Sequence, residues 1–438
     1  MKTEKNRFTI QYVYPTQAVS VLIVVIGFLV DGIMINTFLG DTAQAAYGLT
    51  APLTIVNAAL CGLISSGVQV LMGRSTGGND PDETDRIYTT AAVFGAILSL
   101  CVVIPVLIMP KKAAVLLGAT NDEMIRLTAE YIQMIVLSFP LIMITSMFPA
   151  LFTLSGRKKT PMISAILLCI SDIVLNYLNI KVIHWGMRGM ALATVLSYVI
   201  SFAHFTADKT LAPERMFTFR LRTFERSLVK KLLRYGSMYF VYKICTALLS
   251  FVFTKKLSSI GDSYLTANAI LINVALVTEA FTSASNNTTN MLCSYWIGKK
   301  DNDGLRKFMY RMTTTSVLIH ICLAAICILS ARAIVGIFHV ESELTFELAV
   351  SAVCLYSLCM PVNAVNGIYR AYDLCTDRRR SAYILTVFNF FIMPVAAMLL
   401  IVRLCEPKYF WAAYAAGQGL VTLAVTGKML SKWRALKN

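Results

Sequence analysis

The chain has 438 residues, of which 57% are apolar and only 15% are charged, and its mean hydropathy is +0.65. This composition is typical of a protein built mainly from membrane-spanning helices, and it excludes an ordinary soluble globular domain. The net charge of +16 does not indicate a nucleic-acid binder, because the basic residues are spread over many short segments rather than gathered on one face. The sequence therefore predicts an integral membrane protein.

Twelve apolar stretches long enough to cross a bilayer follow one another along the chain. They lie near residues 17–39, 46–72, 88–109, 127–154, 161–181, 187–207, 236–254, 264–294, 312–330, 347–371, 381–403 and 409–431. The expected fold is all-α, with a six-helix lobe at 1–208, a basic connector at 209–234 and a second six-helix lobe at 235–438. No cleavable signal sequence is predicted, because the first apolar run is long enough to span and lacks a small-residue exit.

The second half of the chain repeats the first half at a constant offset of 221 residues. Small, helix-breaking and loop positions keep this register without a gap: Gly40 returns as Gly261, Asp80 as Asp301, Pro140 as Pro361, and the basic run 157–159 as 378–380. Because each half has an even number of spans, both copies enter the membrane in the same direction. Duplicated bundles of this kind commonly bind a ligand where the repeats meet.

The loops predict the orientation. With both termini in the cytoplasm, 29 of the 40 basic residues fall on inner segments, as the positive-inside rule requires. We therefore expect a multi-pass protein of the cell (inner or plasma) membrane with cytoplasmic termini. The connector holds eight basic residues with Phe and Leu between them, which predicts an interfacial amphipathic stretch on acidic headgroups, with a plain linker as the alternative.

Two carboxylates of the first half are candidates for chemistry, because a charge inside hydrocarbon costs roughly 2.5 to 3.5 kcal/mol. Asp31 lies in the middle of the first span, and Asp172 shares a helix face with Asn176, four residues on. Each of these three positions, like Thr194, is followed 221 residues later by an apolar residue. That asymmetry favours a cation or proton site over the alternative, a carboxyl that only hydrogen-bonds between helices.

The second half of the chain carries a different set of polar and charged residues inside its spans. Lys243 either snorkels to the interface or faces a cavity, where it would pair with Glu279 or a substrate anion. Glu279 is in mid-span and either lines the cavity or makes a structural hydrogen bond. The polar run 285–290 cannot face lipid, so it lines a cavity or caps an unwound turn. The candidate substrate-cavity residues are therefore Lys243, Glu279, Asn286, Asn287, Thr288 and Asn290.

The residues of the first half resemble the multidrug and toxin extrusion (MATE) family, part of the wider multidrug/oligosaccharidyl-lipid/polysaccharide flippase superfamily. The pattern is Asp31 in the first span, Pro52 in the second, a Gly-rich loop at 73–78, and the polar positions from Asp172 to Thr194. The resemblance implies a V-shaped pair of six-helix bundles that export organic, often cationic compounds in exchange for H⁺ or Na⁺. It also implies that Asp31 is the coupling group, with Asp172, Asn176 and Thr194 completing the cation site.

The chain departs from the family pattern at two places. The usual order in the fifth span is Asn and then Asp, whereas here Asp172 precedes Asn176, which moves the carboxylate by about 6 Å. Many members also carry a glutamate in the seventh span, where this chain has Lys243.

Several other functions are weighed against export. A flippase or dedicated exporter for a lipid-linked or amphipathic metabolite would need a cavity with several basic residues, and the span interiors offer only Lys243. A channel or receptor fits a one-sided polar site less well. An enzyme would need a nucleophile or a ligand cluster, but the four His and eleven Cys are scattered, and no nucleotide-binding G-x-x-x-x-G-K-[ST] motif occurs.

We therefore predict no enzyme activity, no cofactor, and no metal apart from Na⁺ at the coupling site. The expected partners are small organic substrates and the lipid bilayer, not nucleic acid, and the chain is expected to act as a monomer.

Overall fold

The computed structural model describes residues 9–211, 216–340 and 342–435, with side chains described up to residue 427. Within these residues the chain is helical and contains no strand, and it forms two compact units, Met1–Ser237 and Met238–Asn438. Eleven helices of the described part are long and apolar enough to cross a membrane, and α20 (Ala412–Ala435) stands at the twelfth predicted span. This confirms the all-α membrane fold with two lobes.

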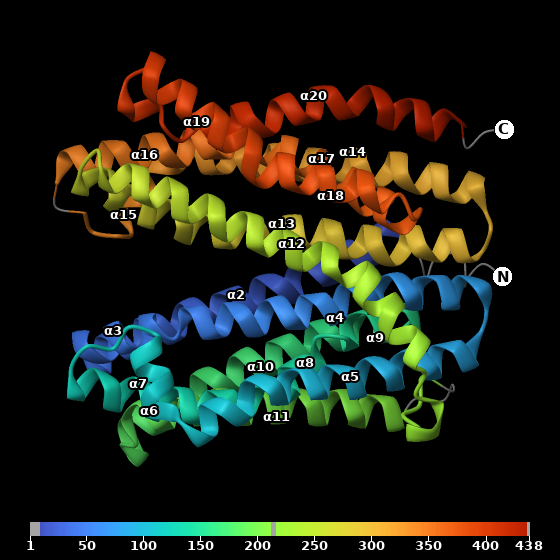
Figure 1. Ribbon diagram of the computed structural model, residues 1–438, viewed down its shortest axis with the longest axis horizontal. Helices are drawn as coiled ribbons and strands as arrows, with labels where there is room; N and C mark the ends of the chain where they lie inside the picture. The colour runs from blue at the N-terminus through green and yellow to red at the C-terminus, as the bar shows by residue number, and fades with distance from the viewer. Residues whose placement is uncertain (1–8, 212–215, 341, 436–438) are drawn as a thin grey trace. The chain divides into compact units, whose positions relative to one another are not determined.

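The first unit contains six membrane passes, drawn from blue to green in Figure 1. Its helices are α2 (Ile10–Leu39), α3 (Asp41–Leu49), α4 (Ala51–Gly78), α5 (Pro81–Ile108), α6 (Pro110–Leu116), α7 (Asp122–Ile135), α8 (Phe139–Thr145), α9 (Phe148–Leu154), α10 (Lys159–Leu178) and α11 (Gly186–Thr210). The 3₁₀ turn η1 (Val136–Ser138) joins α7 to α8, and the π-helical turn η2 (Asn179–Ile183) ends α10.

The second unit repeats this order from α12 (Arg226–Ser258), whose first residues belong to the first unit. Its other helices are α13 (Asp262–Gly298), α14 (Asn302–Leu329), α15 (Ala331–Gly336), α16 (Glu343–Ser357), α17 (Met360–Cys375), α18 (Arg379–Val387), α19 (Met393–Leu404) and α20. The π-helical turn η4 (Phe388–Ile392) joins α18 to α19, and the 3₁₀ turn η5 (Pro407–Tyr409) precedes α20.

The turns explain why the duplication keeps its register. Positive φ angles recur at the 221-residue offset in the pairs Gly40 and Gly261, Asn79 and Lys300, Gly118 and His339, and Gly156 and Asp377. A residue with positive φ commonly ends a helix, because it turns the chain away from the helix axis. The caps recur as well: Asp80 accepts the amide of Glu83 at the start of α5, and Asp301 accepts that of Gly304 at the start of α14.

Prolines break the same pass in both units. In the first unit, η1 interrupts the fourth pass just before Pro140. In the second unit, α16 ends at Ser357 and α17 begins at Met360, so that Pro361 stands in the first turn of α17. Proline has no amide to donate and is therefore favoured at the start of a helix rather than inside it.

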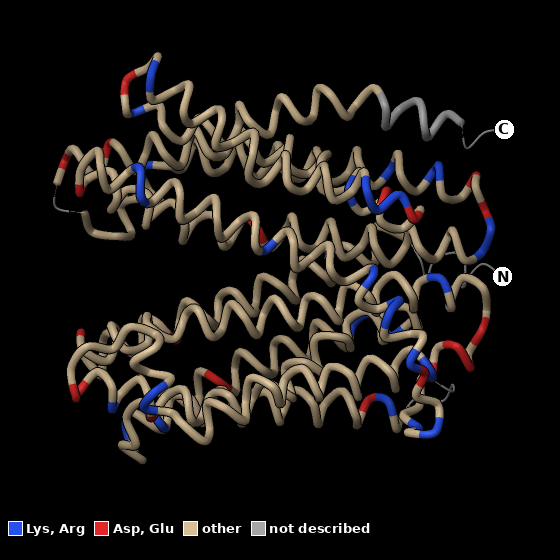
Figure 2. Tube along the Cα trace, in the orientation of Figure 1, with Lys and Arg blue, Asp and Glu red and all other residues tan. Residues whose placement is uncertain are grey.

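The described part of the connector packs against the first unit. Phe217 is fully buried against the rings of Tyr88 and Phe152, and the amide of Thr218 donates to Asp85 on α5 over 2.6 Å. Residues 212–215 of the predicted amphipathic stretch lie outside the described residues. Figure 2 shows that most charged residues gather towards the helix ends, with long uncharged stretches between them.

Candidate functional site

The structure brings together three of the candidate residues of the first half. The Asn176 side-chain amide on α10 donates to Asp31 Oδ1 on α2 over 2.9 Å and lies 3.4 Å from Asp172 Oδ2. Asn176 is fully buried and Asp172 is 4% exposed, while Asp31 is half-buried. A single amide therefore links two carboxylates in the middle of a helix bundle.

The fourth candidate reaches the same cluster from α11. The hydroxyls of Thr194 and Ser197 lie close enough to interact with Asp172, while each donates its hydrogen to a backbone carbonyl of α11. Asp172 Oδ1 and Asn176 Oδ1 are buried without a hydrogen-bond partner. Buried oxygens of this kind call for a proton or a hard cation, because leaving them unsatisfied costs free energy. The cluster thus has the donor set for H⁺ or Na⁺.

The reversed order of Asp172 and Asn176 has a structural consequence. Asn176 occupies the position next to Asp31, and its amide contacts both carboxylates, which also interact with each other directly through their side chains. Two carboxylates in direct contact would repel each other unless they shared a proton. The contact between Asp31 and Asp172 therefore calls for a shared proton, and the Asn176 amide adds a donor to the pair.

The second unit brings Lys243 and Glu279 together. Lys243 Nζ lies 3.3 Å from Glu279 Oε1, and the Tyr242 hydroxyl donates to the same oxygen over 2.7 Å. The two charged side chains are 28% and 34% exposed. Of the two interpretations of Lys243, the structure therefore supports pairing with Glu279 rather than a side chain that snorkels to the interface.

Arg370 on α17 is a residue that the sequence analysis missed. It is 8% exposed, its guanidinium lies 4.8 Å from the centroid of the Tyr242 ring and 5.1 Å from that of Phe390, and it interacts electrostatically with Glu279. The statement that Lys243 is the only basic residue inside the spans is therefore wrong. Arg370 falls at the end of the predicted tenth span, 347–371, where sequence alone cannot distinguish a buried residue from a loop residue.

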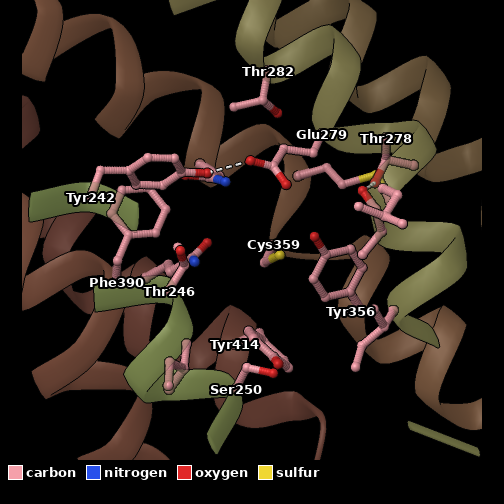
Figure 3. Close-up of a pocket in the computed structure, with 17 residues that line it drawn as sticks. Tyr242, Thr246, Ser250, Thr278, Glu279, Thr282, Tyr356, Cys359, Phe390 and Tyr414 are labelled. Carbon is pink, nitrogen blue, oxygen red and sulfur yellow. Dashed lines mark hydrogen bonds between the residues drawn. The ribbon is translucent and has the colours of Figure 1, made fainter. Parts of the chain in front are cut away.

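A cavity of about 200 Å³ lies beside this cluster, entirely within the second unit. Four aromatic residues from different elements line it: Tyr242 on α12, Tyr356 on α16, Phe390 in η4 and Tyr414 on α20. Glu279 lines it as well, and Figure 3 shows Tyr242 and Glu279 on one side and Tyr356 across the space. The cavity is therefore an aromatic chamber with one carboxylate that is already paired.

The polar run 285–290 lies apart from the residues that line this cavity. It belongs to an uninterrupted helix, α13, so it caps no unwound turn. Ser285 shares a hydrogen bond of 2.7 Å with Ser316 on α14, Thr288 is fully buried, and a Cβ at Gly367 on α17 would meet Asn286 Oδ1 at 2.7 Å. In this structure Asn286, Asn287, Thr288 and Asn290 belong to the helix that packs against α14 and α17.

Two six-helix lobes of this kind, with ionisable clusters in mid-span, define a membrane transporter. A sequence model of the MatE family matches residues 17–178 and 240–399, well over half of the chain. The chain belongs to this family, the MATE transporters, whose members are transporters rather than enzymes. No curated protein sequence matches the chain closely enough to count as a relative.

Solved structures share the fold over nearly the whole chain. A structure described as MATE in complex with MaL6 has a TM-score of 0.89 and 18% identity, covering 98% of this chain and 96% of that one. A transporter from Pyrococcus furiosus, described by the reverse polarity of its binding pocket, gives the same values. An outward-facing multidrug resistance MATE transporter has a TM-score of 0.87 and 19% identity, covering 98% and 96%.

Proposed function

We propose that this chain is a secondary antiporter that exports organic compounds in exchange for H⁺ or Na⁺ by alternating access. The observation that supports the proposal is the buried cluster of Asp31, Asp172 and Asn176, in which one amide links two carboxylates. Ion and substrate compete through two conformations of the lobes. Asp31 is the coupling group, and Thr194 completes the cation site.

The available driving force is sufficient for export. One charge that moves across the membrane releases about 2.3 kcal/mol per 100 mV. At about 150 mV, a single coupled cation therefore supports a gradient of a few hundredfold for a neutral substrate. One-for-one exchange against a monovalent organic cation moves no net charge and is driven by the concentration gradient of the ion. The chain acts in this proposal as a monomer in the cell membrane, with both termini in the cytoplasm and no cofactor other than the coupling ion.

The substrates proposed from the resemblance are cationic, drug-like compounds. The second candidate is a flippase or dedicated exporter for an amphipathic metabolite, and Arg370 favours it. The second unit places two cations, Lys243 and Arg370, around one carboxylate, Glu279. The Pyrococcus furiosus transporter is likewise described as having a binding pocket of reverse polarity.

The test is uptake of ethidium, an organic cation, into everted vesicles that contain the wild type or Asp31→Asn, with proton and sodium gradients imposed separately; in everted vesicles, export runs from the medium into the lumen. We expect wild-type export under one gradient only, and no export by Asp31→Asn. Ser171→Ala on α10 is the matched control, because its hydroxyl bonds only the carbonyl of Leu168.

Equal export by Asp31→Asn would overturn the proposed coupling group. If the wild type exports no ethidium under either gradient, cationic drugs are not its substrates. The same vesicles are then tested with an aromatic carboxylate of similar size, and export of that compound under one gradient would support the second candidate.

A further inference from the structure

The charges around the cavity of the second unit add up to a surplus of one cation. Glu279 is the only carboxylate that lines it among the described residues, and both Lys243 and Arg370 lie close to that carboxylate. An ammonium ligand would have to displace Lys243 from Glu279 and would still meet Arg370. An anionic ligand instead meets a net positive charge at side chains that are only 28% and 34% exposed, where electrostatic attraction is stronger than in bulk water.

The guanidinium of Arg370 does not use all of its hydrogen-bond donors in this arrangement. Its guanidinium lies over the rings of Tyr242 and Phe390, and its Nη1 is buried without a hydrogen-bond partner. No described carboxylate forms an ion pair with it. The positive charge of Arg370 is therefore not neutralised by an ion pair. It lies against Tyr242 and Phe390, two of the rings that line the cavity.

The other residues that line the cavity indicate which further groups a ligand should carry. The rings of Tyr242, Tyr356, Phe390 and Tyr414 suit a flat apolar body, because aromatic rings pack edge to face and offset against one another. Two lining acceptors, Asn363 Oδ1 and Gln418 Oε1, are buried without a partner. A hydroxyl or amide N–H on the ligand would satisfy them. The cavity thus calls for an anionic end, an aromatic middle and a hydrogen-bond donor.

We propose that this cavity binds an amphipathic aromatic compound through a single anionic group such as a carboxylate, with Lys243 as its counter-ion. Lys243 is not itself a lining residue, but its ammonium contacts the lining carboxylate of Glu279 over 3.3 Å. Because it also interacts with Tyr239, one of its three N–H groups is left for the ligand. The second lobe is then a substrate site rather than a second cation site. Only the step from binding to transport rests on the proposed function.

The experiment measures binding to the purified full-length protein in detergent with two fluorescent probes of the same shape, 6-hydroxy-2-naphthoate and the corresponding 2-aminomethyl-6-hydroxynaphthalene. We expect the wild type to bind the carboxylate at least tenfold more tightly than the amine. Lys243→Met should weaken carboxylate binding at least tenfold, and Lys243→Arg should restore it. Lys255→Met, on the same helix but exposed at its far end, is the matched control and should bind like the wild type.

A second variant gives a change of opposite sign. Glu279→Gln removes the only negative charge of the group, so carboxylate binding should become several-fold tighter, and this remains measurable if Lys243→Met does not fold. Tighter binding of the amine, no loss in Lys243→Met, or weaker carboxylate binding in Glu279→Gln would each overturn the proposal.

Asp31→Asn separates this proposal from the proposed function. The substitution lies in the first unit, so carboxylate binding should stay unchanged while coupled export is lost. Binding without export in the wild type would contradict antiport but keep the site. Coupled export with no carboxylate binding would support antiport and contradict the proposed carboxylate site.

Discussion

The two lobes repeat one backbone but carry opposite sets of buried charges. The first lobe holds two carboxylates joined by an amide, and the positions 221 residues after Asp31 and Asp172 are Val252 and Met393. The second lobe holds Glu279 with Lys243 and Arg370, whose counterparts in the first lobe are Ala58, Leu22 and Pro149. Turns and caps keep their register because backbone geometry dictates them. Buried charges are free to diverge, because each needs only a local partner.

The largest expected effect concerns the carboxylate pair of the first lobe. Asp172→Asn should lower coupled export by roughly a hundredfold, at the upper end of typical coupling energies of about 1–3 kcal/mol, because one of two carboxylates is lost. The double variant Asp172→Asn with Asn176→Asp restores the inventory and should recover most of the export. Ion-driven uptake into everted vesicles measures both. A double variant as inactive as the single one would show that the order of the two residues, and not the inventory, matters.

The next effect concerns the connector, which only the first lobe receives. Asp85 accepts the amide and hydroxyl of Thr218, whereas the counterpart of Asp85 in the second lobe is Arg306. Asp85→Asn should weaken docking by about 1.5–3 kcal/mol, the range for hydrogen bonds to a charged group. Tryptic cleavage at the exposed Arg220 should become about tenfold faster or more. Glu83→Gln, half a turn away on α5, should leave the cleavage rate unchanged, and equal rates in both variants would contradict this role.

A packing difference gives a smaller effect. A Cβ at Gly417 on α20 would lie 2.5 Å from the backbone nitrogen of Pro394 on α19, while the counterpart of Gly417 in the first lobe is the exposed Leu196. Gly417→Ala should therefore destabilise the protein by about 1–3 kcal/mol, as overpacking does, and should lower the Tm in detergent. Gly419→Ala has open space around it and should leave the Tm unchanged or raise it slightly, since alanine favours helices. A Tm that is equal in both variants would show that α19 and α20 separate freely.

The smallest expected effect separates binding from stability in the second lobe. The Lys243–Glu279 pair is about one-third exposed, and ion pairs with access to solvent contribute about 1 kcal/mol or less. Lys243→Met should thus lower the Tm by no more than a degree or two while it weakens carboxylate binding at least tenfold. Thermal unfolding with and without the naphthoate probe measures both. A large loss of Tm without ligand would assign Lys243 a structural role instead.

The fold was largely predictable from the sequence because hydropathy and turns are local properties. The apolar runs predicted the helices, and the 221-residue offset predicted the two lobes. The prolines at 140 and 361, which keep the register of the repeat, lie just after the breaks before α8 and α17. The location of a polar side chain around a helix was less accessible: Thr288 is buried, Asn286 and Asn287 are half-buried, and none of the three lines the cavity of the second unit. That the run 285–290 contacts substrate stays a prediction.

The sequence by itself determined that the two halves differ in the charges they carry inside the membrane, although the buried Arg370 was recognised only in the structure. A charge inside the bilayer costs free energy and is rarely found there without a function or a partner. Asp31, Asp172, Lys243 and Glu279 could therefore be singled out from the sequence. Only the tertiary structure decided how they are partnered: Asn176 contacts both aspartates, Lys243 pairs with Glu279, and Arg370 packs against the rings of Tyr242 and Phe390. These contacts join helices far apart in the chain. They depend on helix rotation and side-chain reach, which the order of residues does not fix.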